Sequence, residues 1–74
     1  MPQLPSISGR EVVKAFESLG WSQVRQSGSH IVLVREGHPA TLSVPNHKEV
    51  AKGTLRSLIR SAGVTVEDFL DSLK

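Results

Sequence analysis

One histidine of the chain stands where it could transfer a proton. His30 follows Gly28 and Ser29 and precedes the apolar run of residues 31–34. Glycine takes φ > 0 without a Cβ clash, which suits a tight reversal between two strands, and the run after it favours a strand. An imidazole held at the start of a strand could act as a general acid or base near neutral pH. A histidine with no role at a strand end would look the same, so other features must decide.

Cations recur every four residues in the second half of the chain. Lys52, Arg56 and Arg60 line one edge of a predicted helix, and Lys48 lies just before it. Repeated cations on a rigid element are what a phosphate backbone contacts, although a solvated helix edge shows the same pattern. The formal net charge is +2, with the cations concentrated over residues 25–60 and acidic residues in the last ten. This distribution predicts one face that attracts anions.

The other two histidines are expected to have other roles. His38 precedes Pro39 in a predicted turn and is expected to be a solvent-exposed loop residue. His47 lies near the start of the basic helix, where a structural or phosphate-positioning role is favoured over catalysis. The chain has no cysteine, and three scattered histidines do not form a metal-ligand pattern, so neither a metal nor another cofactor is expected. The sequence also lacks a glycine-rich phosphate loop and a nucleophile elbow.

Length and composition narrow the class of protein. A chain of 74 residues is expected to form one domain, residues 1–74. The lack of cysteine is typical of a reducing compartment. The N-terminus has no basic segment followed by an apolar one, and no apolar run approaches the roughly 18 residues of a membrane span. We therefore expect a cytoplasmic protein without a membrane association.

Three helices are expected from apolar residues at helical spacing. They cover residues 9–19, a segment that begins at residues 53–54 and ends at residue 63, and residues 66–73. Ser8 and Glu11 form a capping-box pattern before the first helix. Thr54 is the expected N-cap of the second helix, and Thr65 caps the third.

Three strands are expected between the first two helices. They cover residues 21–26, 29–35 and 40–44, and Pro45 is expected to end the third because proline lacks the N–H that a strand ladder needs. Short strands at this spacing form an antiparallel meander, which needs helices against one face to be stable. The order α-β-β-β-α-α, with the helices on one face of a three-stranded antiparallel sheet, predicts an α+β domain.

The alternation along the second strand divides its side chains between two faces. Ile31 and Leu33 are assigned to the core, which leaves His30, Val32 and Val34 on the face away from the helices. A histidine with two valines is unusual for a solvated surface and indicates that something covers this face. The alternative is that loops partly cover both faces.

The element order and the basic helix resemble those of double-stranded-RNA-binding domains. Such domains contact phosphates with lysines at the start of the helix after the third strand. Lys48, Lys52 and Arg56 occupy comparable positions, but they lack the tight lysine cluster of that family.

Several motifs in order resemble the HicA family of small toxin ribonucleases, also called YcfA-like proteins. The matching segments are residues 4–5, 8–16, 19–21, 25–30 with its Gly-Ser-His, 44–47 with its Val-Pro-Asn-His, 52–60 with its Gly-Thr-Leu, and 62–70. The resemblance covers nearly the whole chain. It implies a fold like that of the double-stranded-RNA-binding domains, cleavage of mRNA without a metal, and neutralisation by a HicB-like antitoxin.

The resemblance also assigns roles to residues. It implies that His30, in the Gly-Ser-His segment, is the single catalytic histidine. We expect an RNA-binding surface from cations and one further histidine: Arg25, Arg35, His47, Lys48, Lys52, Arg56 and Arg60. Val32 and Val34 are expected to face the antitoxin. Two alternatives are a non-catalytic double-stranded-RNA-binding module and a purely structural partner protein.

Overall fold

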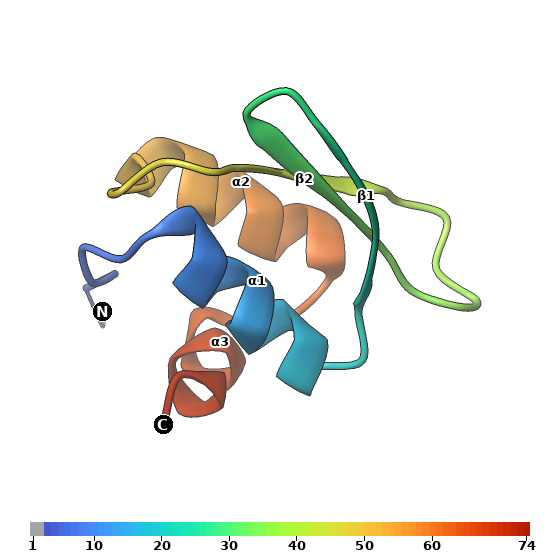
Figure 1. Ribbon diagram of the computed structural model, residues 1–74. Helices are drawn as coiled ribbons and strands as arrows, with labels where there is room; N and C mark the ends of the chain where they lie inside the picture. Colours follow the sequence, from blue (N-terminus) through green and yellow to red (C-terminus); the bar gives the residue numbers. More distant parts are fainter. Residues whose placement is uncertain (1–2) are drawn as a thin grey trace.

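A three-stranded antiparallel sheet lies over three helices in the computed structural model, which describes residues 3–74 (Figure 1). The elements are α1 (Gly9–Ser18), β1 (Ser22–Ser27), β2 (His30–Val34), β3 (Leu42–Pro45), α2 (Lys52–Ala62) and α3 (Val66–Ser72). The strand order is β1-β2-β3, so the chain is a simple meander. The predicted α+β class and the order α-β-β-β-α-α are confirmed.

The helices cover only one face of the sheet (Figure 1). α1 packs against β1 and β3, α2 packs against β3, and α3 packs against both other helices. The predicted division of β2 is confirmed, because Ile31 and Leu33 are 5% and 0% exposed in the core while His30 is exposed and Val32 and Val34 are half-buried. Within residues 3–74, no helix lies over the face that carries His30.

The prediction that Pro45 lies outside the third strand was wrong. β3 begins two residues later than expected, at Leu42, and includes Pro45 as the partner of His30. The next residue, Asn46, donates its N–H to the Ser29 carbonyl across the ladder at 2.6 Å. Neighbouring N–H groups of a strand point in opposite directions, so the position of Pro45 needs no donor toward β2. An edge strand tolerates proline for this reason.

The predicted caps of the first and third helices are confirmed. Ser8 and Glu11 form a capping box at α1, and Thr65 and Asp68 form one at α3. The prediction that Thr54 caps α2 was wrong. The N-cap is Ala51, whose carbonyl accepts from the Leu55 N–H at 2.9 Å, so α2 begins at Lys52. The buried Val50 just before the cap fixes this start by packing rather than by a side-chain hydrogen bond.

An aromatic cluster joins the helices to the loop between β2 and β3. The Phe16 ring lies 5.3 Å from Phe69 and 6.4 Å from Trp21, measured between ring centroids. Trp21 precedes β1 rather than opening it, and it is buried. The expectation that His38 is solvent-exposed was wrong, because its ring lies 5.0 Å from that of Trp21 and it is half-buried. Its Nδ1 accepts from the Ala40 N–H at 3.2 Å, which holds the loop in place.

None of the helices in the described part of the chain is long and apolar enough to cross a membrane.

Candidate functional site

His30 lies at the end of a tight hairpin between β1 and β2. Gly28 has φ of 59° in the turn, which suits the first central residue of a two-residue hairpin loop. The ladder places His30 opposite Ser27 of β1 and opposite Pro45 of β3. The imidazole therefore stands on a paired central strand but remains exposed to solvent. The strand is thus a rigid support for the ring, and its exposure leaves the ring open to a ligand.

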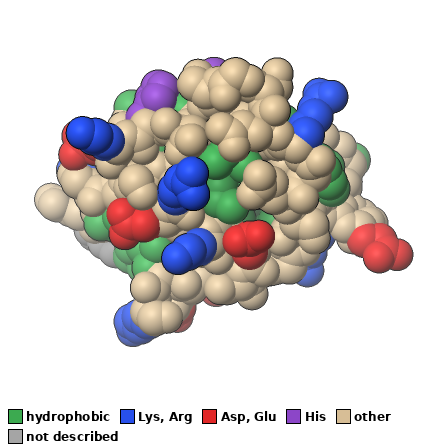
Figure 2. Space-filling model, viewed as in Figure 1, with side chains coloured by type: hydrophobic (Ala, Val, Ile, Leu, Met, Phe, Trp, Pro, Cys, Tyr) green, Lys and Arg blue, Asp and Glu red, His purple; other side chains and the backbone are tan. Residues whose placement is uncertain are grey.

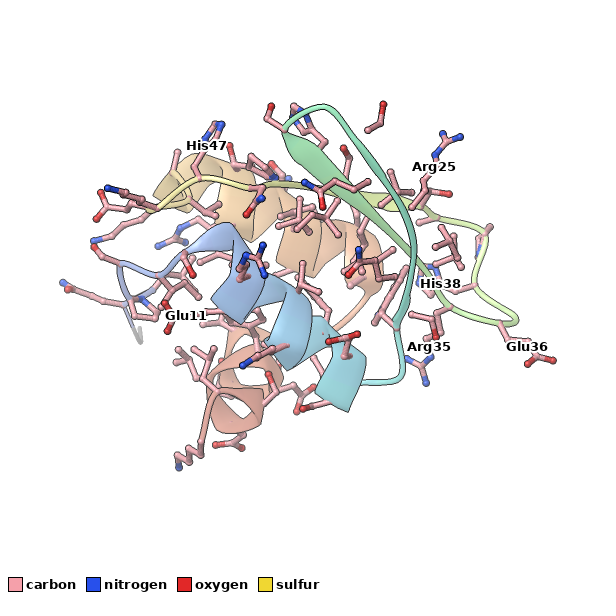
Figure 3. All side chains as sticks on the ribbon, in the orientation of Figure 1. Glu11, Arg25, Arg35, Glu36, His38 and His47 are labelled. Atoms are coloured by element: carbon pink, nitrogen blue, oxygen red, sulfur yellow. The ribbon has the colours of Figure 1, made fainter. Side chains whose placement is uncertain are left out.

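Arg25 shares the uncovered face with His30. It pairs with Val32 in the β1–β2 ladder, which makes it a diagonal neighbour of His30, about 7–8 Å away between Cα atoms. Its side chain is exposed and points away from the helices (Figure 3). A guanidinium at this place can hold a phosphate that reaches His30.

The segment after β3 brings His47 and Lys48 to the same end of the sheet as His30. The Asn46 N–H donates to the Ser29 carbonyl at 2.6 Å, and the Gly9 N–H donates to the His47 carbonyl at 2.9 Å. Figure 3 shows the His47 ring pointing away from α1. His47 and Lys48 are both exposed.

Gly9 holds this segment by a close approach that no other residue allows. A Cβ at Gly9 would collide with the Pro45 carbonyl oxygen and would lie 2.9 Å from the Asn46 Cα. Sequence reasoning gave Gly9 no role of its own. The contact joins residues far apart in the chain, so a single sequence carries no local signal for it.

The predicted cations of α2 form a continuous exposed edge. Lys52, Arg56 and Arg60 follow one another at four-residue spacing, from the end of the helix near His47 toward its C-terminus. In the part of the chain that the structure describes, the ion pair is Lys74 with Asp71, so none of these three cations is neutralised by an acidic partner. The first turn of α2 adds positive potential, because within residues 3–74 no side chain caps its N–H groups.

Arg35 lies at the other end of β2. It lies five positions after His30, which is about 16 Å along an extended strand. Its guanidinium packs over Gly20, 3.3 Å from the place of a Cβ on that glycine. Figure 3 shows Arg35 at the end of the sheet opposite His47. The structure thus places Arg25 and His47 on opposite sides of β2, each as a neighbour of His30, and keeps Arg35 at the far end of the strand.

A hollow with apolar atoms at its floor lies between α1 and β1 (Figure 2). Its volume is about 290 Å³, and its lining includes Lys14, Glu17, Gln23 and Ile31. It opens on the helix side of the sheet, and His30 does not line it. Figure 2 shows histidine atoms at the upper left and at the top of this view, away from the hollow. The hollow and the histidine face are therefore separate surfaces.

Among the described residues, no three His, Asp or Glu side chains gather closely enough to hold a metal ion.

One exposed apolar side chain was not predicted from the sequence. Val24 is 55% exposed where the β1–β2 register shifts between Gln23 and Arg25. Such a bulge disrupts the free edge of β1 and limits unwanted strand pairing.

Comparisons with known proteins point to one family. The family model described as the HicA toxin of bacterial toxin–antitoxin systems matches residues 9–64. A solved chain from a toxin–antitoxin complex of Streptococcus pneumoniae is 30% identical, with a TM-score of 0.70, over 78% of this chain and 98% of that chain. No curated protein sequence matches.

Proposed function

Because the chain belongs to the HicA toxin family of bacterial toxin–antitoxin systems, we propose that it is a metal-independent endoribonuclease that cleaves mRNA. The observation that carries this proposal is the position of His30. It is exposed on a paired strand, on a sheet face that no helix covers, with Arg25 beside it. The whole chain then serves as one toxin domain that acts in the cytoplasm, where its substrate is.

The reaction uses a nucleophile that RNA itself supplies. The 2′-hydroxyl attacks the adjacent phosphorus, a base takes its proton, and an acid gives a proton to the departing 5′-oxygen. The products are a 2′,3′-cyclic phosphate and a 5′-hydroxyl. His30 performs one of the two proton transfers, a role that contributes typically 10²–10⁴-fold to a rate. Arg25 stabilises the charge that develops on the phosphate oxygens.

The cations near His30 hold the RNA backbone. Lys48 follows His47 in the loop and Lys52 begins α2, and Arg56 and Arg60 extend the same edge along that helix. His47 belongs to the same surface. Arg35 contacts only RNA that continues to the far end of β2. Phosphate contacts of this kind fix the position of the strand and carry little sequence information.

A HicB-like antitoxin neutralises the toxin by covering the same sheet face. Val32 and Val34 are half-buried beside His30, and their apolar surface favours a protein partner over solvent. An inhibitor seated there keeps RNA away from His30. The structurally similar Streptococcus pneumoniae chain was solved within a toxin–antitoxin complex, which supports a partner of this kind.

A second candidate is a non-catalytic module that binds double-stranded RNA. The order of the elements and the basic edge of α2 favour it, since both also occur in such modules. It predicts binding with steep salt dependence and no cleavage.

Incubation of the antitoxin-free protein with a folded mRNA in excess EDTA separates the two candidates. The ribonuclease leaves fragments that end in a 2′,3′-cyclic phosphate, and an RNA with 2′-deoxy substitutions at the cleavage sites stays intact. Intact RNA that is nevertheless retained at low salt and released at high salt would instead establish the binding module. Cleavage that EDTA abolishes would contradict a metal-independent reaction.

A further inference from the structure

His47 lies in line with the histidine face of the sheet, although β3 ends before it. The β2–β3 ladder pairs His30 with Pro45, and the bond from the Asn46 N–H to the Ser29 carbonyl continues it by one step. In an extended backbone, the side chain of the residue after Asn46 lies on the face that Pro45 and His30 share. That residue is His47.

Two contacts show that the backbone keeps this course. A Cβ on Gly9 would meet the carbonyl oxygen of Pro45, and the Gly9 N–H donates to the carbonyl of His47 at 2.9 Å. The carbonyls two residues apart therefore face the same partner, as they do in an extended strand. The His47 ring points away from α1, in agreement with this course (Figure 3).

His30 and His47 are thus diagonal neighbours across two adjacent strands. Such neighbours lie about 7–8 Å apart, which is within reach of long or aromatic side chains. Both rings are exposed, and neither is tied into a hydrogen bond with a side chain among the described residues. One phosphodiester can occupy the space between them and be contacted by both.

We propose that His47 is the second proton-transfer group of the cleavage reaction, paired with His30. This rests on the ribonuclease function proposed above and supplies what that mechanism lacks, since one imidazole cannot serve both oxygens at once. One ring removes the proton from the 2′-hydroxyl as the new P–O bond forms. The other donates a proton to the 5′-oxygen as the old P–O bond breaks. The proton count balances, and the histidines end with exchanged protonation states.

Charged groups from several elements lie on the two sides of this pair. Lys48 and Glu49 follow His47 in the same loop, Lys52 begins α2, and Arg25 lies on β1. The cations attract the phosphate, so neither imidazole has to bind it as well as transfer a proton.

A substrate whose leaving group needs no proton tests the assignment. The native chain is first used to locate a cleavage site, and an oligonucleotide of that site is made with either oxygen or sulfur at the bridging 5′ position. His47→Gln, His30→Gln and, as a control on the exposed surface of α3, Glu67→Gln are compared by kcat and KM on both substrates. Circular dichroism checks that each variant is folded.

We expect His47→Gln to lower kcat at least 10²-fold on the oxygen substrate, with little change in KM, while Glu67→Gln keeps the native rate. On the sulfur substrate, the variant that lacks the general acid regains most of its rate, and the variant that lacks the general base does not. Recovery of the rate in His47→Gln identifies His47 as the general acid. Recovery in His30→Gln identifies His30 as the acid and His47 as the general base. Either result supports the pair.

Three results would overturn the pair. The first is a native kcat in His47→Gln, and the second is a change in its KM alone. The third is a low rate in both histidine variants that the sulfur substrate restores in neither of them. Failure of the native chain to cut any RNA is a different result, because it removes the ribonuclease function itself.

Discussion

At the scale of single residues, the three histidines of the chain have three environments. His30 is exposed on a paired strand, His47 is exposed on an extended segment, and His38 is half-buried against Trp21. The contact with Trp21 makes His38 a packing residue of the β2–β3 loop. The two exposed rings are free to meet a ligand.

The glycine that holds His47 in place gives a prediction at this scale. Gly9→Ala is expected to destabilise the fold by about 1–3 kcal/mol, because the added Cβ must displace the backbone of Pro45 and Asn46. It is also expected to slow RNA cleavage beyond the loss of folded protein, because the same displacement moves His47. Urea unfolding and cleavage rates of the folded fraction measure the two effects.

Gly53→Ala is the matched control for that substitution. Gly53 lies in α2 at a place where an added Cβ would point into open space. Alanine is favoured over glycine in a helix by up to about 1 kcal/mol, so this variant is expected to be as stable as the native chain or more so. A Gly9→Ala variant as stable as Gly53→Ala would contradict the close approach.

The residue pattern was sufficient to predict the place of His30 but not that of His38. The position of His30 follows from a local turn and from alternation along one strand, and both signals lie within a few neighbouring residues. The burial of His38 depends on Trp21, which comes from the other side of the β-hairpin. A dipeptide such as His38-Pro39 indicates a turn and says nothing of such a partner.

At the scale of elements, local rules predicted the type of every helix and strand but not all of their ends. The two capping boxes were recognised because each one joins a residue to another three positions away. The start of α2 was missed because Val50 anchors it through the core, and Thr54 is a good cap only in isolation. Tertiary packing overrides local preference at such places.

The end of β3 was also missed, because it depends on the place of the strand in the sheet. Proline argues against a strand when the strand is central, but β3 is at the edge of the sheet. Its place in the order β1-β2-β3 is a property of the whole sheet. The bulge of β1 at Val24 likewise follows from pairing with β2 and leaves no mark in the residues themselves.

At the scale of the whole molecule, the two sides of the sheet have different roles. The helix side holds the core, and the other side presents His30, Val32 and Val34 without a covering element. A small domain buries a limited share of its surface, so a partner on this face also adds stability. Under the proposed function, we expect RNA and the antitoxin to compete for this surface.

A substitution on the uncovered face tests whether the antitoxin binds there. Val32→Asp is expected to weaken binding of the antitoxin at least tenfold, which corresponds to about 1.4 kcal/mol, because it places a charge in an apolar contact. Isothermal titration with the cognate antitoxin measures the change. Ser61→Asp, an exposed position of α2 with the same added charge, is the control and is expected to bind as the native chain does. Equal affinities for the two variants would place the antitoxin elsewhere.

Proton transfer by His30 is tested most directly by the single-turnover cleavage rates of the native chain and of His30→Ala, measured with RNA in excess EDTA. We expect the rate of His30→Ala to be lower by about 10²–10⁴-fold, with the affinity for RNA and the thermal unfolding midpoint unchanged. A His30→Ala variant that cuts the same RNA at close to the native rate would contradict it.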